Sequence, residues 1–197
     1  MRGVNDPSSV RVHDEAMAAD DEAALIAEAQ RDPRAFDALY GRYVTRVYRY
    51  ARAHTAGDED AADLTQQVFL RALDALPRYR AGPAPFGGWL FRIARNTVVD
   101  AHRRRTSPRI TLDALPEALH PHADHEPEAT LLRAEALSRL RELVAALDAE
   151  KRELLALRFA ARLSSPSIAA VVGKSPAAVQ KQLTRILHAL KEQYNDT

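Results

Sequence analysis

The sequence predicts an all-α protein built from two small helical domains. Only seven of the 197 residues are glycine, while alanine, leucine, arginine and glutamate are abundant, and these residues lose little rotamer freedom on a helix. In several segments the apolar residues recur at the i, i+3, i+4, i+7 spacing of a helix. A proline-rich, acidic stretch in the middle of the chain divides these segments into two groups.

The first group of helices is expected to form a domain over residues 22–105. It follows an N-terminal tail, residues 1–21, in which small and charged residues show no apolar period, and such ends are commonly mobile. A short helix is expected over residues 22–30. Asp32 followed by Pro33 is typical of an N-cap and a first helical position, and the apolar spacing after them predicts a long amphipathic helix.

Two more helices complete this first domain. One is expected to begin near Asp58 and to end before Pro77, because proline cannot continue a helix. The loop over residues 79–88 is rich in turn-forming residues, and helical apolar spacing resumes over residues 89–105. The first domain is therefore expected to be a small helical bundle.

The middle of the chain, residues 106–130, combines four prolines with five acids and three histidines. This composition cannot build a core of its own, so we interpret the segment as a flexible linker between domains. His120, His122 and His125 raise the alternative of a metal site. Their proline-broken setting favours solvated linker residues instead, and we expect neither a metal nor a cofactor.

The second domain is expected over residues 131–197 and ends in a helix-turn-helix. Ser164 or Ser165 can cap a short helix, Gly173 allows a left-handed turn at its end, and Ser175 before a proline can cap a final helix. Two capped helices joined by a glycine turn are typical of DNA-binding helix-turn-helix units. An ordinary helical hairpin with a solvated polar face carries the same signals and remains the alternative.

The composition excludes several classes of protein. Without cysteine the chain has no disulfide, no thiolate metal site and no cysteine nucleophile. No apolar run approaches the roughly 20 residues that span a bilayer, and the N-terminus lacks the apolar core of a secretion signal. Glycine-rich phosphate loops, metal-ligand clusters and nucleophile motifs do not occur. We therefore expect a cytoplasmic protein that is not an enzyme and does not insert into a membrane.

The charges of the chain are distributed unevenly. A net charge of +1 argues against strong stand-alone binding to nucleic acid, but residues 89–109 hold six arginines and a single acid. Cations beside aromatic side chains suit a surface that binds a nucleic-acid backbone and stacks unpaired bases. Trp89 by itself fits a core position better than a stacking platform, and the terminal arginines also fit a helix C-terminus. The candidate cations are Arg92, Arg95, Arg103 and Arg104.

The second helix of the predicted helix-turn-helix carries the candidate DNA-reading surface. Alanine and threonine methyl groups can contact thymine, and longer polar side chains can reach base edges or phosphates. The opposite face of this helix repeats apolar residues, which are expected to face the core. The candidate reading residues are Ser175, Ala177, Ala178, Gln180, Lys181, Gln182, Thr184 and Arg185.

Three segments of the chain resemble one protein family. The sequences ADLTQQVFLRAL at residues 62–73 and PFGGWLFRIARNTVVDAHRRR at residues 85–105 resemble region 2 of the extracytoplasmic-function (ECF) sigma factors of bacterial RNA polymerase. Residues 157–190, LRFAARLSSPSIAAVVGKSPAAVQKQLTRILHAL, resemble region 4 of the same family. The motifs occur in the family's order with a linker between them, and the resemblance covers about residues 22–192.

The resemblance implies a non-enzymatic subunit that gives RNA polymerase its promoter specificity. The implied partners are core RNA polymerase, through its clamp and flap elements, promoter DNA and an anti-sigma factor. Region 2 would read the minus-ten element and region 4 the minus-thirty-five element. The residues that match clamp-docking positions are Asp63, Gln66 and Gln67, and those that match a pocket for a flipped minus-ten base are Tyr79, Ile93, Asn96 and Asp100.

Some residues depart from the family's pattern. Gln67 stands where the family usually has glutamate, which removes a possible charge-assisted hydrogen bond to the clamp. In the recognition helix Gln180 and Gln182 replace two frequent cations, with Lys181 restoring one. These changes lower the attraction to phosphate and leave the minus-thirty-five sequence unpredictable.

Two alternatives to a sigma factor remain at this point. The main rival is a stand-alone helix-turn-helix regulator whose N-terminal domain binds a partner or ligand. The other is an interaction protein that has lost DNA binding, which the departures in the recognition helix would favour if they are disabling. The DLTQQVF and WLFRIARN motifs discriminate against the first alternative, because such a regulator has no reason to carry them.

Overall fold

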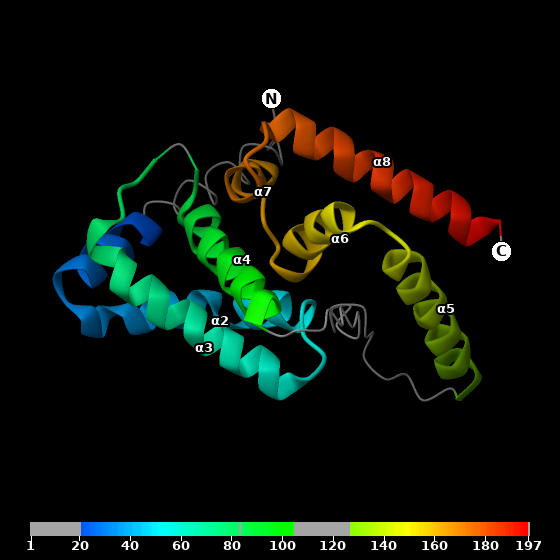
Figure 1. Cartoon of the computed structure of the whole chain (residues 1–197), viewed down its shortest axis with the longest axis horizontal. Helices are drawn as coiled ribbons and strands as arrows, with labels where there is room; N and C mark the ends of the chain where they lie inside the picture. The colour runs from blue at the N-terminus through cyan, green and yellow to red at the C-terminus, as the bar shows by residue number, and fades with distance from the viewer. Residues whose placement is uncertain (1–20, 83, 105–126, 197) are drawn as a thin grey trace, which may run out of the picture.

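The computed structural model describes residues 21–82, 84–104 and 127–196, and within these ranges it is helical and has no β-strand (Figure 1). The predicted all-α class is confirmed. The predictions for the N-terminal tail and for His120, His122 and His125 concern residues outside these ranges. After a helix over residues 21–31, the chain forms η1 (Pro33–Ala35), α2 (Phe36–Arg52), α3 (Asp58–Ala75), η2 (Leu76–Arg78), α4 (Phe86–Arg104), α5 (Pro127–Ala145), α6 (Ala149–Leu155), η4 (Ala156–Ala160), α7 (Ser165–Val172) and α8 (Pro176–Asn195).

The helix-turn-helix has the caps that its sequence predicts. Ser164 is the N-cap of α7, and its side chain accepts a hydrogen bond from the backbone N–H of Ser167. Gly173 ends α7 in the left-handed region with φ 71°, which costs glycine little because it has no Cβ. Ser175 then caps α8 and accepts a hydrogen bond from the N–H of Ala178.

One helix boundary differs from that predicted, because α5 begins at Pro127, inside the range assigned to the linker. α6 begins at Ala149, where the Asp148 side chain accepts a hydrogen bond from the backbone N–H of Lys151 and caps the helix. The helix continues through η4, and the chain then turns at Arg162, whose φ is 53°.

The first half of the structure is built on α2, α3 and α4, which pack against one another. α2 and α4 bury aromatic and aliphatic side chains such as Tyr50, Phe91 and Leu90, each at most 1% exposed. In the second half α8 packs on α5, α6 and α7. Among the helices of the described ranges, none has both the length and the apolar character needed to cross a bilayer.

The two halves do not stand apart, because α7 packs on α4 and η4 packs on α2. Their buried side chains form one continuous cluster. Figure 1 shows the orange α7 directly above the N-terminal part of the green α4, with α8 leading away from both. This arrangement decides which faces of α4 and α8 are available for binding.

Candidate nucleic-acid and polymerase interface

α4 presents different residues to the core and to solvent. Phe91, Ala94 and Val98 are buried and hold the helix on the core, whereas Arg92 and Asn96 are exposed. The predicted base-reading residue Asn96 therefore lies on a solvent-facing surface of the helix. Its carboxamide offers both a donor and an acceptor to a base edge there.

The last turn of α4 adds exposed cations to this surface. Arg103 and Arg104 are both exposed, and the Arg104 Nε donates a hydrogen bond to the Asp100 carbonyl oxygen at 3.2 Å. Cations at a helix C-terminus also offset the helix dipole. Their exposed position at the end of α4 therefore fits both interpretations, the binding of a nucleic-acid backbone and the compensation of the helix dipole.

Tyr79 belongs to an aromatic cluster beside the N-terminus of α4. Its ring centroid lies 5.0 Å from that of Trp89 and 5.3 Å from that of Phe86, and the three rings pack on the core. Burial raises the pKa of the Tyr79 hydroxyl, and the charge of Glu22 raises it further. Gln30 fixes the loop by donating to the Tyr79 carbonyl oxygen at 2.9 Å.

The predictions for Trp89 and Ile93 can be compared with this cluster. Trp89 is partly buried against the core, in keeping with the core role favoured for it. Ile93, predicted to line a base pocket, is also half-buried against the core. Tyr79 and Trp89 thus form an aromatic contact beside the N-terminal end of α4.

Asp100 is neutralised by a residue that the sequence analysis did not single out. Arg71 Nη1, from α3, lies 2.9 Å from Asp100 Oδ2 and 3.2 Å from Thr97 Oγ1. An acid near DNA is repelled unless it is paired or accepts from a base. The ion pair with Arg71 offsets the repulsion between Asp100 and DNA phosphates. Because the two residues are 29 positions apart, no local sequence pattern could reveal this pair.

Arg95 is placed away from the other candidate cations. Its Nε lies 3.5 Å from Glu153 Oε1, a carboxylate of α6 in the second half of the chain. The structure therefore does not bring Arg95 together with Arg92 and Asn96 on the exposed face. It places Arg95 at the contact between the two halves, beside Tyr50.

The predicted docking residues lie in a row on α3. Asp63, Gln66 and Gln67 are all exposed. Gln66 lines a groove of about 650 Å³ between α2 and α3, together with Tyr40 and Leu70. The side chains of these two apolar residues are unusually exposed, at 44% and 56%, and an exposed apolar patch rimmed by polar residues is typical of a protein-binding site. Sequence analysis missed both residues because an apolar residue on a helix is normally assigned to the core.

α8 has the two faces that its sequence predicts. Val179, Leu183, Ile186 and Leu190 are buried, which confirms the core-facing stripe. The candidate reading residues that are exposed are Ser175, Ala177, Ala178, Gln180, Lys181, Thr184 and Arg185. The first two turns of α8 are therefore open to a partner.

Gln182 differs from the other candidate reading residues. Its Oε1 accepts a hydrogen bond from Lys174 Nζ at 2.9 Å, and its Nε2 donates to Glu150 Oε1 at 3.1 Å. Lys174 also makes a close ion pair with Glu150. The hydrogen bonds from Lys174 and Gln182, with the Lys174 charge, lower the pKa of Glu150. The carboxamide of Gln182 thus joins α8 to α6.

Comparison with known proteins places these features in a family. The family model for Sigma-70 region 2 matches residues 39–107, and the model for Sigma-70, region 4 matches residues 137–190. The first match contains α3 and α4, and the second contains α7 and most of α8.

Curated relatives and a solved structure agree with these matches. The chain is 38% identical over 152 residues to the ECF RNA polymerase sigma factor SigD of Mycobacterium tuberculosis, covering 75% of this chain and 71% of SigD. It is 32% identical over 179 residues to the ECF sigma factor BldN of Streptomyces coelicolor, covering 88% and 67%. The structure of CnrH in complex with the cytosolic domain of CnrY matches with 27% identity and a TM-score of 0.62, covering 88% of this chain and 96% of that chain. Both sigma regions occur in their expected order with relatives along most of the chain, and the protein therefore belongs to the ECF sigma factors of RNA polymerase.

Proposed function

We propose that the chain is a non-enzymatic initiation subunit that binds core RNA polymerase and directs it to the promoters of a specific set of genes. The observation that carries this proposal is the joint match to sigma regions 2 and 4. The exposed polar residues of α4 and α8 support it, because they offer one candidate reading surface in each region. As core polymerase works in the cytoplasm, we place the chain there too.

The proposed polymerase-docking surface is the exposed face of α3. Asp63, Gln66 and Gln67 supply hydrogen-bonding groups, while Tyr40 and Leu70 supply apolar area beside them. Buried apolar contacts give most of the affinity of such interfaces, and the polar rim sets their orientation. Gln67 can both donate and accept a hydrogen bond, so its amide can still bind the polymerase at a position where the family usually has a carboxylate.

The proposed minus-ten reader combines Asn96 with the Tyr79 ring. An aromatic surface stabilises an unpaired base by about 1–3 kcal/mol per base through stacking, and the Asn96 amide can pair with the edge of that base. Arg92 and Arg103, exposed on the same helix, are assigned to phosphates. Asn96 would therefore supply the base specificity, while Arg92 and Arg103 would position the DNA backbone.

The proposed minus-thirty-five reader is the start of α8. Ala177 and Ala178 offer methyl groups to thymine, and Lys181 and Arg185 offer cations to bases or phosphates. Gln182 is assigned to holding α8 rather than to reading a base, since Lys174 and Glu150 occupy its carboxamide.

An anti-sigma factor is the third proposed partner, after polymerase and DNA. The similar protein CnrH is recorded in complex with the cytosolic domain of CnrY. Because this chain matches CnrH over 88% of its length, we infer that it is controlled by a partner of the same kind.

Run-off transcription with purified core polymerase tests the proposal. On a pool of DNA templates the wild-type chain should produce transcripts that start at a shared sequence motif, and Asn96→Ala should reduce them about tenfold, since a good base contact is worth about 1–3 kcal/mol. Asn195→Ala, at the exposed end of α8, is the matched control and should leave them unchanged. A chain that retards DNA by itself, yet gives no promoter-dependent transcript with polymerase, would instead be a stand-alone regulator.

A further inference from the structure

A carboxylate of α6 lies beside the recognition helix α8. Gln182 follows Ser175 by seven residues and Ala178 by four, so the three residues share one face of α8. The Nε2 of Gln182 donates to Glu150 Oε1 at 3.1 Å. Because Ser175 and Ala178 are exposed candidate reading residues, Glu150 lies at the edge of the surface that we assign to DNA.

The same carboxylate holds a cation at the start of α8. Lys174 lies between Gly173, which ends α7, and Ser175, which caps α8. Its Nζ makes a close ion pair with Glu150 Oε1 and donates to Gln182 Oε1 at 2.9 Å. Lys174 and Gln182 therefore donate to one carboxylate oxygen. Glu150, Lys174 and Gln182 are here called the Glu150 triad.

The triad lies where DNA phosphates are expected. In a helix-turn-helix the N-terminal end of the second helix enters the major groove, and polar groups around it contact the phosphates that border the groove. A phosphate oxygen accepts hydrogen bonds from ammonium and amide groups, as a carboxylate oxygen does. Glu150 therefore gives Lys174 and Gln182 the kind of acceptor that DNA would give them.

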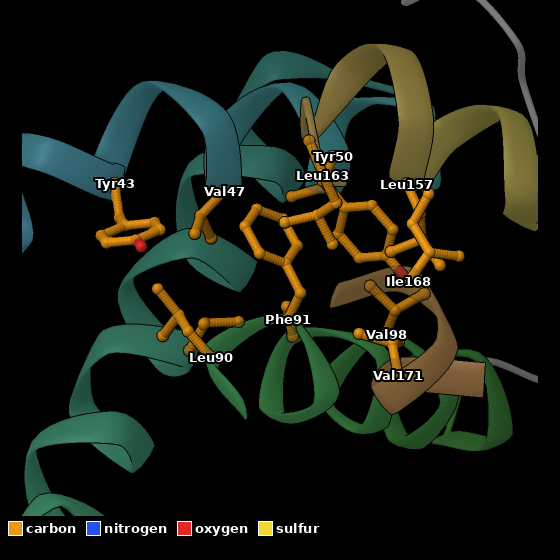
Figure 2. Close-up of a cluster of buried hydrophobic side chains, with 14 of the residues drawn as sticks. Tyr43, Val47, Tyr50, Leu90, Phe91, Val98, Leu157, Leu163, Ile168 and Val171 are labelled. Atoms are coloured by element: carbon orange, nitrogen blue, oxygen red, sulfur yellow. The ribbon is translucent and has the colours of Figure 1, made fainter. Parts of the chain in front are cut away.

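The helices that carry the triad are held in place by the core. Figure 2 shows Leu157 of η4 and Ile168 and Val171 of α7 pointing into one buried cluster. α6 continues directly into η4, and α8 packs on both α6 and α7. The backbones on either side of the ion pair between Glu150 and Lys174 are therefore fixed relative to each other.

The triad is nevertheless open to water. The side chain of Glu150 is 60% exposed and that of Lys174 is 32% exposed. The hydrogen bonds from Lys174 and Gln182, with the Lys174 charge, lower the pKa of Glu150, so the carboxylate is ionised at neutral pH. Exposed ion pairs contribute little to stability, and substitutions in the triad should therefore leave the chain folded.

Few cations are close to the start of α8 in the sequence. Residues 173–185 contain three, Lys174, Lys181 and Arg185, and the last two are exposed on α8. Each cation that neutralises a phosphate releases counterions and makes binding more dependent on salt. Whether Lys174 meets a phosphate or a carboxylate thus changes a measurable property of promoter binding.

We propose that Glu150 competes with promoter DNA for Lys174 and so lowers the affinity of α8 for the phosphates of the minus-thirty-five element. In the promoter complex Lys174 stays with Glu150, whose own charge repels nearby phosphates. Glu150 acts through Lys174 and is a positioning residue, not a DNA contact. This inference rests on the proposed function of α8 as the minus-thirty-five reader.

A purely structural role of the triad predicts the opposite effect. If the triad served only to hold α8 on α6, removing the Glu150 charge would loosen the recognition helix and weaken promoter binding. Competition for Lys174 predicts tighter binding instead. The sign of the change in affinity therefore separates the two roles.

Promoter binding by the holoenzyme at several salt concentrations measures this sign. The probe is a promoter recovered from the template pool by run-off transcription. Glu150→Gln should bind it more tightly and steepen the slope of log affinity against log salt by about 1, so that the gain is about threefold larger at 50 mM than at 200 mM salt. Glu142→Gln, at an exposed glutamate of α5, is the matched control and should leave the slope unchanged. Weaker binding by Glu150→Gln would overturn the proposal.

Removal of Lys174 shows whether Glu150 acts through it. Lys174→Ala should lower the slope by about 1 in the Glu150→Gln chain, where Lys174 is free to meet a phosphate, and by much less in the wild-type chain. An equal loss in both chains would show that Glu150 acts only through its own charge, and the proposal would then be wrong.

A shortened template shows where Glu150 acts. On DNA that ends between the two promoter elements, Glu150→Gln and the wild type should bind equally, because α8 has no phosphates to contact. A gain that persists on this template would refute the assignment to α8. Absence of any promoter-dependent transcript from the wild-type chain would instead count against the proposed function, so the two failures are distinguishable.

Discussion

At the scale of single residues, several side chains have partners that are distant in the sequence. Gln182 is held by Glu150, 32 positions away, and Asp100 by Arg71, 29 positions away. A recognition-helix residue whose polar atoms are occupied has little left to offer a base. Its neighbour Lys181 is exposed. It can approach a phosphate when the DNA lies along the face of α8 that we propose as the minus-thirty-five reader.

Lys181 and Gln182 should therefore respond differently to substitution. Lys181→Ala should weaken promoter binding by the holoenzyme and reduce the slope of log affinity against log salt by about 1, because one phosphate contact is lost. Gln182→Ala should leave this slope unchanged. The measurement is promoter binding at several salt concentrations, and a changed base preference in Gln182→Ala would contradict the assignment.

Tyr50 should make stability depend on alkaline pH. Burial raises the pKa of its hydroxyl well above 10.0, and the charge of Glu153 adds to this despite Arg95. The unfolded chain releases this proton above about pH 10 while the folded chain keeps it, so the stability is present below pH 10 and falls as pH rises further.

This pH dependence can be measured by denaturant unfolding between pH 9 and pH 12. Tyr50→Phe keeps the ring and removes the hydroxyl, so its stability should fall less steeply with pH than that of the wild type. Its stability at neutral pH is lower too, which is why the slopes are compared. Parallel slopes would show that the Tyr50 proton is not retained.

At the scale of helices, boundaries follow caps and glycines that act locally. Asp148, Ser164 and Ser175 each accept a backbone hydrogen bond at the start of a helix. Two glycines have opposite roles, since Gly173 adopts φ 71° in a turn, whereas Gly41 lies inside α2 with open space around it.

These two glycines should respond oppositely to alanine. Gly41→Ala should stabilise the protein by roughly 0.5–1 kcal/mol, because alanine loses less entropy in a helix. Gly173→Ala should destabilise it by about 1 kcal/mol, because a Cβ is strained at this φ. Urea unfolding measures both, and a stabilised Gly173→Ala chain would mean that the turn does not need a left-handed residue.

At the scale of the whole molecule, the shared core joins regions that the sequence separates. Buried side chains of α2 and α4 and those of η4 and α7 form one cluster. A protein with one such core unfolds in a single cooperative transition, even when its sequence divides it into two domains.

Gly88→Leu should separate the unfolding of the two regions. The leucine side chain has no room against Ser167 and Ala170, so α7 must move away from α4. Calorimetry should give one transition for the wild type and two for this variant, while Gly41→Leu, at a position where an added Cβ atom meets nothing within 4 Å, should keep a single transition. Two transitions in the wild type would show that the regions are already independent.

Local patterns along the chain were sufficient to predict the all-α class, the helix-turn-helix with its caps, the core-facing stripe of α8 and the family. These features depend on local periodicity, on cap residues and on motifs, all of which are read within a few turns of chain. The contact of Arg95 with Glu153, the contact of Gln182 with Glu150 and the packing of α7 against Gly88 emerged only from the folded chain. Contacts of this kind join residues far apart in the chain, and they depend on how whole helices pack, which no local pattern encodes.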